Sequence, residues 1–259
     1  CANNDYKWFN ETVEHLDAGY KVKFKKTECE YKLEVSFNHS DNLLFPETES
    51  DCNPPPHTET YWNAMKFRKS VYKKTGLHHV SLDWTPCGHP PEIWKKPHYD
   101  IHFYRATVAE RDEMTCDLLT GAPICNPHDQ STAAGRAFFS GAFYQESDQY
   151  SNMPPGFNKT SSDPYHAIPR MGQHVWGGEN IPATMADWNY PVLVMGTYDA
   201  TIVSFELMIP HEYLENPDGE QKQVVYMGQT IETLPYSYKT YRKNGKFRIM
   251  LKGTMSNCP

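Results

Sequence analysis

One short stretch of alternating side chains constrains this chain more than any other feature. Residues 98 to 104 alternate between polar and apolar side chains, which is typical of a β-strand with two different faces. The polar face carries His98, Asp100 and His102. Burying three such groups costs free energy unless they are compensated. The stretch therefore predicts a strand that packs one face into a core and uses the other for a metal ion or a dense hydrogen-bond network.

The remainder of the chain favours β-structure as well. Aromatic residues make up 14% of the sequence, and 20 prolines and 15 glycines interrupt it often, which favours many short strands over long helices. Alternating patterns predict hairpins near residues 20 to 37, 191 to 209 and 236 to 251. We expect a mainly β fold, an antiparallel sandwich or barrel with a few short helices.

Two further segments bear on the organisation of the chain. The Thr107-Val-Ala-Glu110 spacing is that of a capping box and predicts a short helix that runs through Met114. Residues 38 to 60 contain three consecutive prolines and are expected to form a long surface loop. The segment before this loop is too short to bury a core of its own. We therefore expect residues 1 to 259 to form a single β domain.

Several features indicate a secreted glycoprotein. Three Asn-x-Ser/Thr sequons occur, at Asn10, Asn38 and Asn158, and each is a candidate glycosylation site. The sequence starts at Cys1 without a methionine or an apolar leader. We expect either that a signal peptide has been removed or that the sequence is part of a longer chain. The predicted location is extracellular.

The cysteines support the same location. The chain has seven, without a CxxC motif, and this usage suits an oxidising compartment in which disulfide bonds form. Cys116 and Cys125 bracket a short loop and are the expected local pair, and Cys1 with Cys258 would join the two ends. Because the number is odd, one thiol is left free or joined to another chain. Cys87 is the candidate for it.

Charge and hydropathy exclude two classes of partner. The formal net charge of -7 argues against nucleic-acid binding, which requires a basic surface. No run of about 18 apolar residues occurs, so no membrane-spanning helix is expected. A small molecule is the partner that remains. The sequence predicts no oligomeric state.

Strand geometry limits which residues could share a metal ion. Side chains at positions i and i+2 of a strand are about 6.6 Å apart at Cα, whereas positions i and i+4 are about 13 Å apart. Asp100 can therefore chelate an ion with one flanking histidine, but His98 and His102 share an ion only if a bulge bends the strand. The best-placed additional ligands are His174, which lies in a glycine-rich segment, and His89, which lies in a turn.

His89 and Glu206 stand in reserve as further ligands of this predicted metal site. His89 lies in a Gly-His-Pro-Pro turn, and Glu206 replaces an apolar residue in the middle of a strand pattern. Either could act as a general acid or base near neutral pH. Asp83 is expected to be a turn residue or an acid that supports the site.

A set of imidazole and carboxylate ligands suits zinc, divalent iron, manganese or copper and does not choose among them. An ion with an open coordination position could activate water or polarise a substrate, whereas a closed shell would be structural. Without a metal, the histidines would be core residues satisfied by neighbouring acids or backbone, His174 and His89 would belong to packed turns, and Glu206 would lie on a solvated face. No nucleophile elbow, P-loop or dinucleotide fingerprint is present.

The central motif has two blocks: residues 83 to 91 read Asp-Trp-Thr-Pro-Cys-Gly-His-Pro-Pro, and residues 97 to 104 read Pro-His-Tyr-Asp-Ile-His-Phe-Tyr. This motif resembles a family of secreted and periplasmic β proteins that is defined as a domain of unknown function. A later Pro-x-Met-Gly-x-His-x-Trp block extends the likeness, which covers about residues 75 to 215. The resemblance implies a β-rich domain with histidines gathered at one site and implies no established activity. The extra cysteines and the long amino-terminal segment depart from the family pattern.

A looser likeness is to the cupin barrels, in which a histidine-rich strand and a later Pro-x-x-Gly-x-His turn converge on one metal. Pro169 to His174 is similar in order and chemistry, but His98-x-Asp-x-His102 departs from the usual His-x-His. This likeness implies a cupin-like or jelly-roll barrel. The resulting hypothesis is a metal-dependent enzyme that acts on a small molecule. The alternatives are a binding or carrier protein without turnover and a structural extracellular protein.

Overall fold

The structure is a computed structural model of the chain. It describes residues 7–9, 20–38, 64–89, 92–114, 157–159, 167–168, 170–177, 181–198, 201–223 and 235–255. The strands are β1 (Lys7–Phe9), β2 (Tyr20–Lys26), β3 (Glu30–Asn38), β4 (Met65–Lys66), β5 (His79–Thr85), β6 (His98–Tyr104), β7 (Phe157–Lys159), β8 (Ala167–Ile168), β9 (Gly172–Gly177), β10 (Val192–Tyr198), β11 (Thr201–Pro210), β12 (Gln221–Gln223), β13 (Pro235–Lys243) and β14 (Lys246–Thr254). The helices are α1 (Lys69–Thr75), α2 (Val108–Glu113), α4 (His211–Glu215) and the 3-10 helix η3 (Glu92–Trp94).

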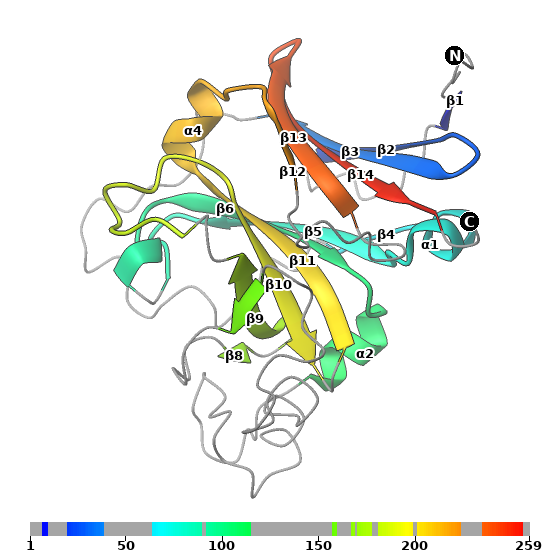
Figure 1. The fold of residues 1–259 in the computed structure, drawn as a ribbon, viewed down its shortest axis with the longest axis horizontal. Helices are drawn as coiled ribbons and strands as arrows, with labels where there is room; N and C mark the ends of the chain where they lie inside the picture. The colour runs from blue at the N-terminus through cyan, green and yellow to red at the C-terminus, as the bar shows by residue number, and fades with distance from the viewer. Residues whose placement is uncertain are drawn as a thin grey trace, which may run out of the picture.

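The strands form two antiparallel sheets, which Figure 1 shows one above the other. The six-stranded sheet has the order β1-β2-β3-β14-β13-β12. The eight-stranded sheet has the order β4-β5-β6-β11-β10-β9-β7, with β8 paired to β9. The predicted mainly β fold is confirmed as a sandwich. Within the described residues neither sheet closes on itself, so the barrel alternative does not apply.

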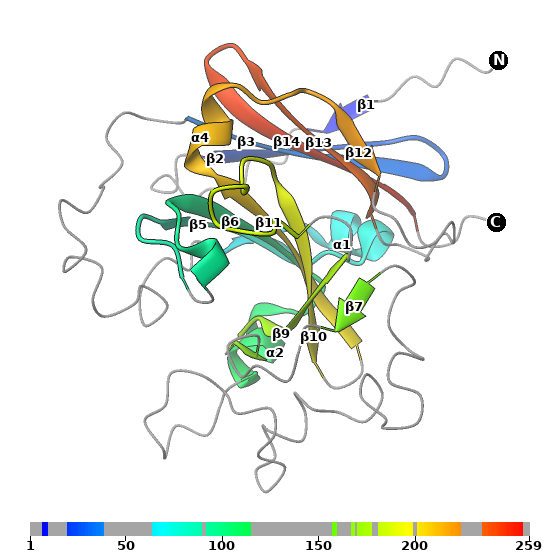
Figure 2. The ribbon, with the colours of Figure 1, turned by 60° about the vertical axis from the view of Figure 1, so that its left-hand side comes forward.

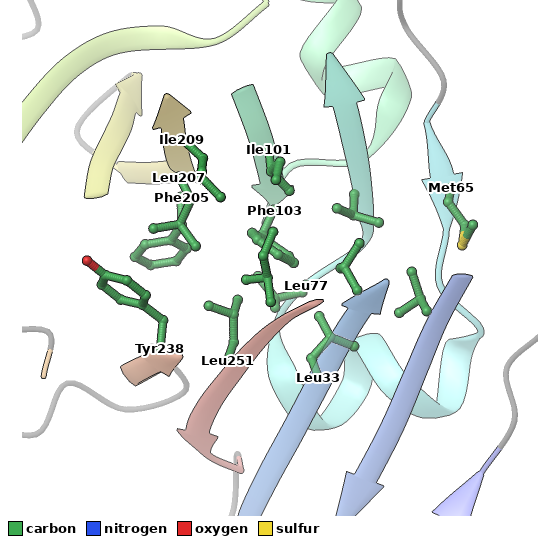
Figure 3. Close-up of a cluster of buried hydrophobic side chains, with 14 of the residues drawn as sticks. Leu33, Met65, Leu77, Ile101, Phe103, Phe205, Leu207, Ile209, Tyr238 and Leu251 are labelled. Carbon is green, nitrogen blue, oxygen red and sulfur yellow. The ribbon is translucent and has the colours of Figure 1, made fainter. Parts of the chain in front are cut away.

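The main core lies between the two sheets. Leu33 and Leu251 of the six-stranded sheet face Phe103 and Leu207 of the eight-stranded sheet (Figure 3). All four side chains are buried, and burying a side chain of this size contributes about 1.5 to 3 kcal/mol to stability. The apolar positions of each strand recur with a period of two, so they line the one surface that the opposite sheet covers.

Strand β6 lies in the interior of the eight-stranded sheet. It pairs with β5 on one side and β11 on the other over its full length, without a register shift. Both of its faces are buried. Its odd-numbered residues belong to the main core, so its even-numbered residues point to the opposite side, where α2 and β9 lie (Figure 2).

The three predicted hairpins are confirmed as β2 with β3, β10 with β11 and β13 with β14. The last one turns at Asn244 and Gly245, which both have positive φ, as a two-residue hairpin turn requires. The predicted capping box is also confirmed: the Thr107 hydroxyl accepts from the Glu110 amide, and the Glu110 carboxylate accepts from the Thr107 amide. The predicted loop after Asn38 lies almost wholly outside the described residues.

Two cysteines fall within the described residues, and both Cys29 and Cys87 are disulfide-bonded. The prediction that Cys87 is the free thiol is therefore wrong, because its place in a turn says nothing about which cysteine the fold brings near it. The predicted pairs Cys116 with Cys125 and Cys1 with Cys258 lie outside the described residues. In the described part of the chain, no helix is both long and apolar enough to span a membrane.

Candidate metal centre

A row of buried polar side chains lines the face of the eight-stranded sheet that points away from the main core. Register places Asp83 of β5 beside Asp100 of β6, and Glu206 of β11 beside His102 of β6. His174 of β9 lies beside Gly196 of β10, and β10 separates β9 from β11 in the sheet. The histidines and acids of the row separate into two groups.

The first group, here called the His98 group, consists of His89, His98 and Asp100. Nε2 of His98 lies 3.1 Å from Oδ1 of Asp100, and Nε2 of His89 lies 3.6 Å from Oδ2 of the same carboxylate. One ligand atom from each residue lies within 4.8 Å of the other two, and all three residues are buried. Three ligand atoms this close together could coordinate one ion.

Neighbouring groups orient the members of the His98 group. Nδ1 of His98 lies 2.5 Å from the Lys96 carbonyl oxygen. A carbonyl oxygen can only accept a hydrogen bond, so Nδ1 is the donor. In the neutral ring this leaves the lone pair on Nε2, which faces Asp100. The Thr85 hydroxyl donates to Oδ2 of Asp100 at 3.1 Å. These contacts hold both side chains with their metal-competent atoms toward each other.

His89 reaches the group through a tight turn between β5 and η3. Gly88 has a φ of +62°, and a Cβ at this position would lie 2.2 Å from the Trp94 carbonyl oxygen. Only glycine fits such a close backbone approach without strain. The His89 amide donates to the Trp94 carbonyl. The His89 and His98 rings pack edge to face, with their centroids 4.9 Å apart.

The second group, here called the His102 group, consists of His102, His174 and Glu206. Oε2 of Glu206 lies 3.4 Å from Nε2 of His102 and 3.5 Å from Nε2 of His174. On the other side of its ring, Nδ1 of His102 lies 3.2 Å from Oδ2 of Asp83. The Ser81 hydroxyl donates to the same Asp83 oxygen at 3.0 Å. His102 therefore bridges a supported carboxylate and Glu206.

Burial and mutual charge push the pKa values of the carboxylates apart. Burial raises the pKa of Glu206, and the nearby Asp100 charge raises it further. For Asp100 burial also opposes ionisation, but the adjacent His98 and His89 hold its pKa below the usual value. Burial likewise raises the pKa of Asp83, against the opposing contact with His102. Such divergence between neighbouring acids is typical of functional sites.

The pKa values of the two central histidines are raised. Burial disfavours the imidazolium of His98, but the Asp100 charge outweighs it. For His102 burial is outweighed by Tyr104 and Glu206, and its pKa lies well above the usual value. In the absence of a cation, protonated imidazoles would therefore balance the carboxylates. A bound divalent ion would supply the same positive charge.

The polar row is enclosed by apolar and aromatic side chains. At the end nearest His98, a small cluster contains Trp94, Trp188 and Met208, and the Trp188 ring contacts the His98 ring at 4.8 Å. At the other end, the Tyr104 ring stacks on His79 at 4.4 Å. These walls lower the local dielectric and strengthen the electrostatic interactions inside.

The four predicted metal ligands do not gather around one point. His98 and Asp100 belong to the His98 group, and His102 and His174 belong to the His102 group. The predicted i to i+4 separation accounts for this division, because β6 has no bulge that would bring His98 and His102 together. His89, predicted as a reserve ligand or as an acid or base, lies against the Asp100 carboxylate, and Glu206 lies between His102 and His174.

Sequence reasoning missed several residues of the row, although a signal was present. Residues 79 to 85 alternate in the same way as residues 98 to 104. Of their polar members, Asp83 contacts His102, Thr85 contacts Asp100, and Ser81 donates to Asp83. Asp83 was expected as a supporting acid, and its contact with His102 agrees with that role. The Lys96 carbonyl and Trp188 could not be found from the pattern.

Comparison with known proteins adds nothing to this description, because no protein-family model, curated protein or solved structure matches the chain. The resemblance to a domain-of-unknown-function family and the cupin likeness therefore remain predictions.

Proposed function

We propose that this chain is a divalent-metal-binding protein whose ion is held by His89, His98 and Asp100. The observation that carries the proposal is the pair formed by Nε2 of His98 and Oδ1 of Asp100. Both atoms are buried, they lie 3.1 Å apart, and neither has a well-formed hydrogen bond with any described residue. Buried polar atoms normally have partners. A cation between them would satisfy both.

The surroundings of His98 support the same proposal. Metal-binding histidines characteristically donate the second ring N–H to a carbonyl or carboxylate, and the Nδ1 contact of His98 with the Lys96 carbonyl has this form. Two imidazoles and one carboxylate suit zinc, divalent iron, manganese or copper. Three protein ligands leave coordination positions for water or a small molecule, where the ion would act as a Lewis acid or activate water. A metal-dependent enzyme is the activity proposed on this basis.

The second candidate is a protein that holds the ion without turnover. Its supporting observation is burial, since His98 and Asp100 are almost completely shielded from solvent. A shell closed by further protein ligands would be structural, as in sites with four protein ligands. The two candidates differ in whether water reaches the ion.

An extracellular location is part of the proposal. The disulfide bonds of Cys29 and Cys87 suit an oxidising compartment. Asn38, the acceptor of the second sequon, is exposed at the end of β3, as glycosylation requires. Expression through a secretory host, followed by enzymatic removal of N-glycans, would test it. A mass unchanged by that treatment, in both the wild type and Asn38→Gln, would contradict glycosylation.

Elemental analysis of the purified chain tests the metal proposal. We expect first-row metal in the wild type and a loss of at least one ion per chain in His89→Ala. His78→Gln is the matched control, because His78 stacks on Tyr72 and contacts neither ligand group, and it should leave the metal content unchanged. Protein that neither contains nor takes up metal would overturn the proposal.

The relaxation rate of water protons in the Mn²⁺-loaded protein then separates the two candidates. An open coordination position exchanges water and raises this rate, so a raised rate supports the enzyme. A rate equal to that of the metal-free protein supports the closed site.

A further inference from the structure

We propose that the same polar face carries a second divalent cation, bound by His102, His174 and Glu206, so that the protein holds a pair of ions. This inference rests on the proposed function for the first ion, at the His98 group. It assigns Glu206 to metal binding, which is one of the two roles that the sequence left open for it.

The contacts of Glu206 supply the first argument. Its Oε2 atom lies 3.4 Å from Nε2 of His102 and 3.5 Å from Nε2 of His174. Neither Oε2 of Glu206 nor Nε2 of His102 has a well-formed hydrogen bond with a described residue, and both are buried. The Glu206 carboxylate therefore lies between two imidazole nitrogens, which are the same kinds of ligand atom that make up the His98 group.

The orientation of His102 supplies the second argument. Its Nδ1 contacts Asp83, and the Ser81 hydroxyl donates to the same Asp83 oxygen. An imidazole that donates to a carboxylate on one side presents its second nitrogen as a lone pair on the other. This carboxylate–histidine arrangement is common behind metal ions. It repeats, with a carboxylate in place of a backbone carbonyl, the support that Lys96 gives to His98.

Strand geometry indicates two ions instead of one shared ion. His98 and His102 are four residues apart on a strand without a bulge, and that spacing corresponds to about 13 Å between Cα atoms. Each histidine faces a different carboxylate, Asp100 or Glu206. Both oxygens of Asp100 face the His98 group, with His98 beside one and His89 and Thr85 beside the other. The second group therefore needs a carboxylate of its own, which Glu206 provides.

The fold holds the ligands of the second group on three strands. β6 and β11 are hydrogen-bonded neighbours that place Glu206 directly beside His102. His174 comes from β9 on the far side of β10, opposite Gly196. A Cβ at Gly196 would lie 2.1 Å from the Met171 carbonyl oxygen, so only glycine lets the segment before His174 pass this close. The cations expected are first-row divalent ions that accept nitrogen and oxygen ligands.

The competing account is a chain of hydrogen bonds without an ion, in which a protonated His102 bridges Asp83 and Glu206. The number of Mn²⁺ ions bound per chain distinguishes the two accounts. We expect metal-free wild-type protein to bind two Mn²⁺ ions per chain. Glu206→Gln, which keeps the shape of the side chain, should bind one, and so should His174→Ala. His89→Ala should also bind one, at the remaining site, and thermal unfolding of each variant confirms that it is folded.

Electron paramagnetic resonance of the Mn²⁺-loaded protein gives an independent measurement. Two ions at adjacent sites should give a wild-type spectrum that is broadened by the dipolar interaction between them, and each single-site variant should show the narrower spectrum of an isolated ion. One ion per wild-type chain, lost in His89→Ala and kept in Glu206→Gln, would overturn the second site and leave the first. One ion per wild-type chain that is lost in both variants would mean a single shared site, and this result would also overturn the second site. No ion in the wild type would overturn both proposals.

Discussion

The two faces of β6 have opposite compositions and are buried equally well. Tyr99, Ile101 and Phe103 pack into the main core between the sheets, whereas His98, Asp100 and His102 face the row of polar side chains. All residues of the strand are buried. The apolar face is stabilised by area removed from water, which needs no particular partner. The polar face is stable only if each group finds a specific partner, because an unmatched buried charge costs several kcal/mol.

This difference indicates which face serves function. A strand in the middle of a sheet that is covered on both sides is usually apolar on both of its faces. Here one face is polar, and its two imidazole–carboxylate groups are each supported by further residues of β5. Rules of local consistency are typically broken at functional sites. The following predictions test whether the two faces are as independent as this comparison implies.

The largest effect is expected on the apolar face. Phe103→Ala would leave a cavity in the main core and should lower the free energy of unfolding by about 3 to 5 kcal/mol. Denaturant titration measures this change. Metal content should stay as in the wild type, because Phe103 points away from the polar row. Loss of metal along with stability would show that the two faces are coupled.

On the polar face, stability should depend on the cation. At a free metal concentration of 100 times the dissociation constant, one bound ion should stabilise the folded state by about 2.7 kcal/mol. A chelator should remove this increment, seen as a lower melting temperature. Phe103→Ala should retain the increment, whereas Asp100→Asn should lose it. An equal response to metal in Asp100→Asn and the wild type would exclude Asp100 as a ligand.

The polar row should also make stability depend on pH, through His79 at its end. Burial, with the charges of Arg111, His78, His102 and Lys66, lowers the pKa of His79 to about 3. Between the ordinary value of 6.5 and about 3, the unfolded chain binds a proton that the folded chain does not, so stability falls as pH falls.

The expected loss from His79 is about 1.4 kcal/mol between pH 7.5 and 5.5. Denaturant titration at both pH values measures it, and His79→Gln should lack this part of the slope. Identical slopes in the two proteins would mean that the pKa of His79 is the same in the folded and the unfolded chain.

The smallest effect is expected from a conservative substitution on the apolar face. Ile101→Val removes one methylene group from the core and should cost about 0.5 to 1.5 kcal/mol, again with no change in metal content. Ile101 lies between Asp100 and His102 in the sequence but on the opposite face. A measurable loss of metal affinity would therefore mean that the backbone of β6 shifts and carries the ligands with it.

Much of the fold could be predicted because its signals are local. The alternation at residues 20 to 37, 191 to 209 and 236 to 251 predicted three hairpins, and the Thr107 to Glu110 spacing predicted α2. Each depends on contacts between residues near one another in the chain. Disulfide partners are not local in this sense, and the prediction that Cys87 is free was wrong for that reason.

The sequence by itself determined that β6 has a polar and an apolar face, and that His98 and His102 are too far apart to share an ion without a bulge. Both follow from the pleat of a strand, which repeats every two residues whatever surrounds it. The tertiary structure decided which acid each histidine meets. His89 reaches Asp100 through the Gly88 turn, and His174 reaches Glu206 because β9, β10 and β11 are neighbours. Strand order is set by packing of the whole sandwich, and no local pattern encodes it.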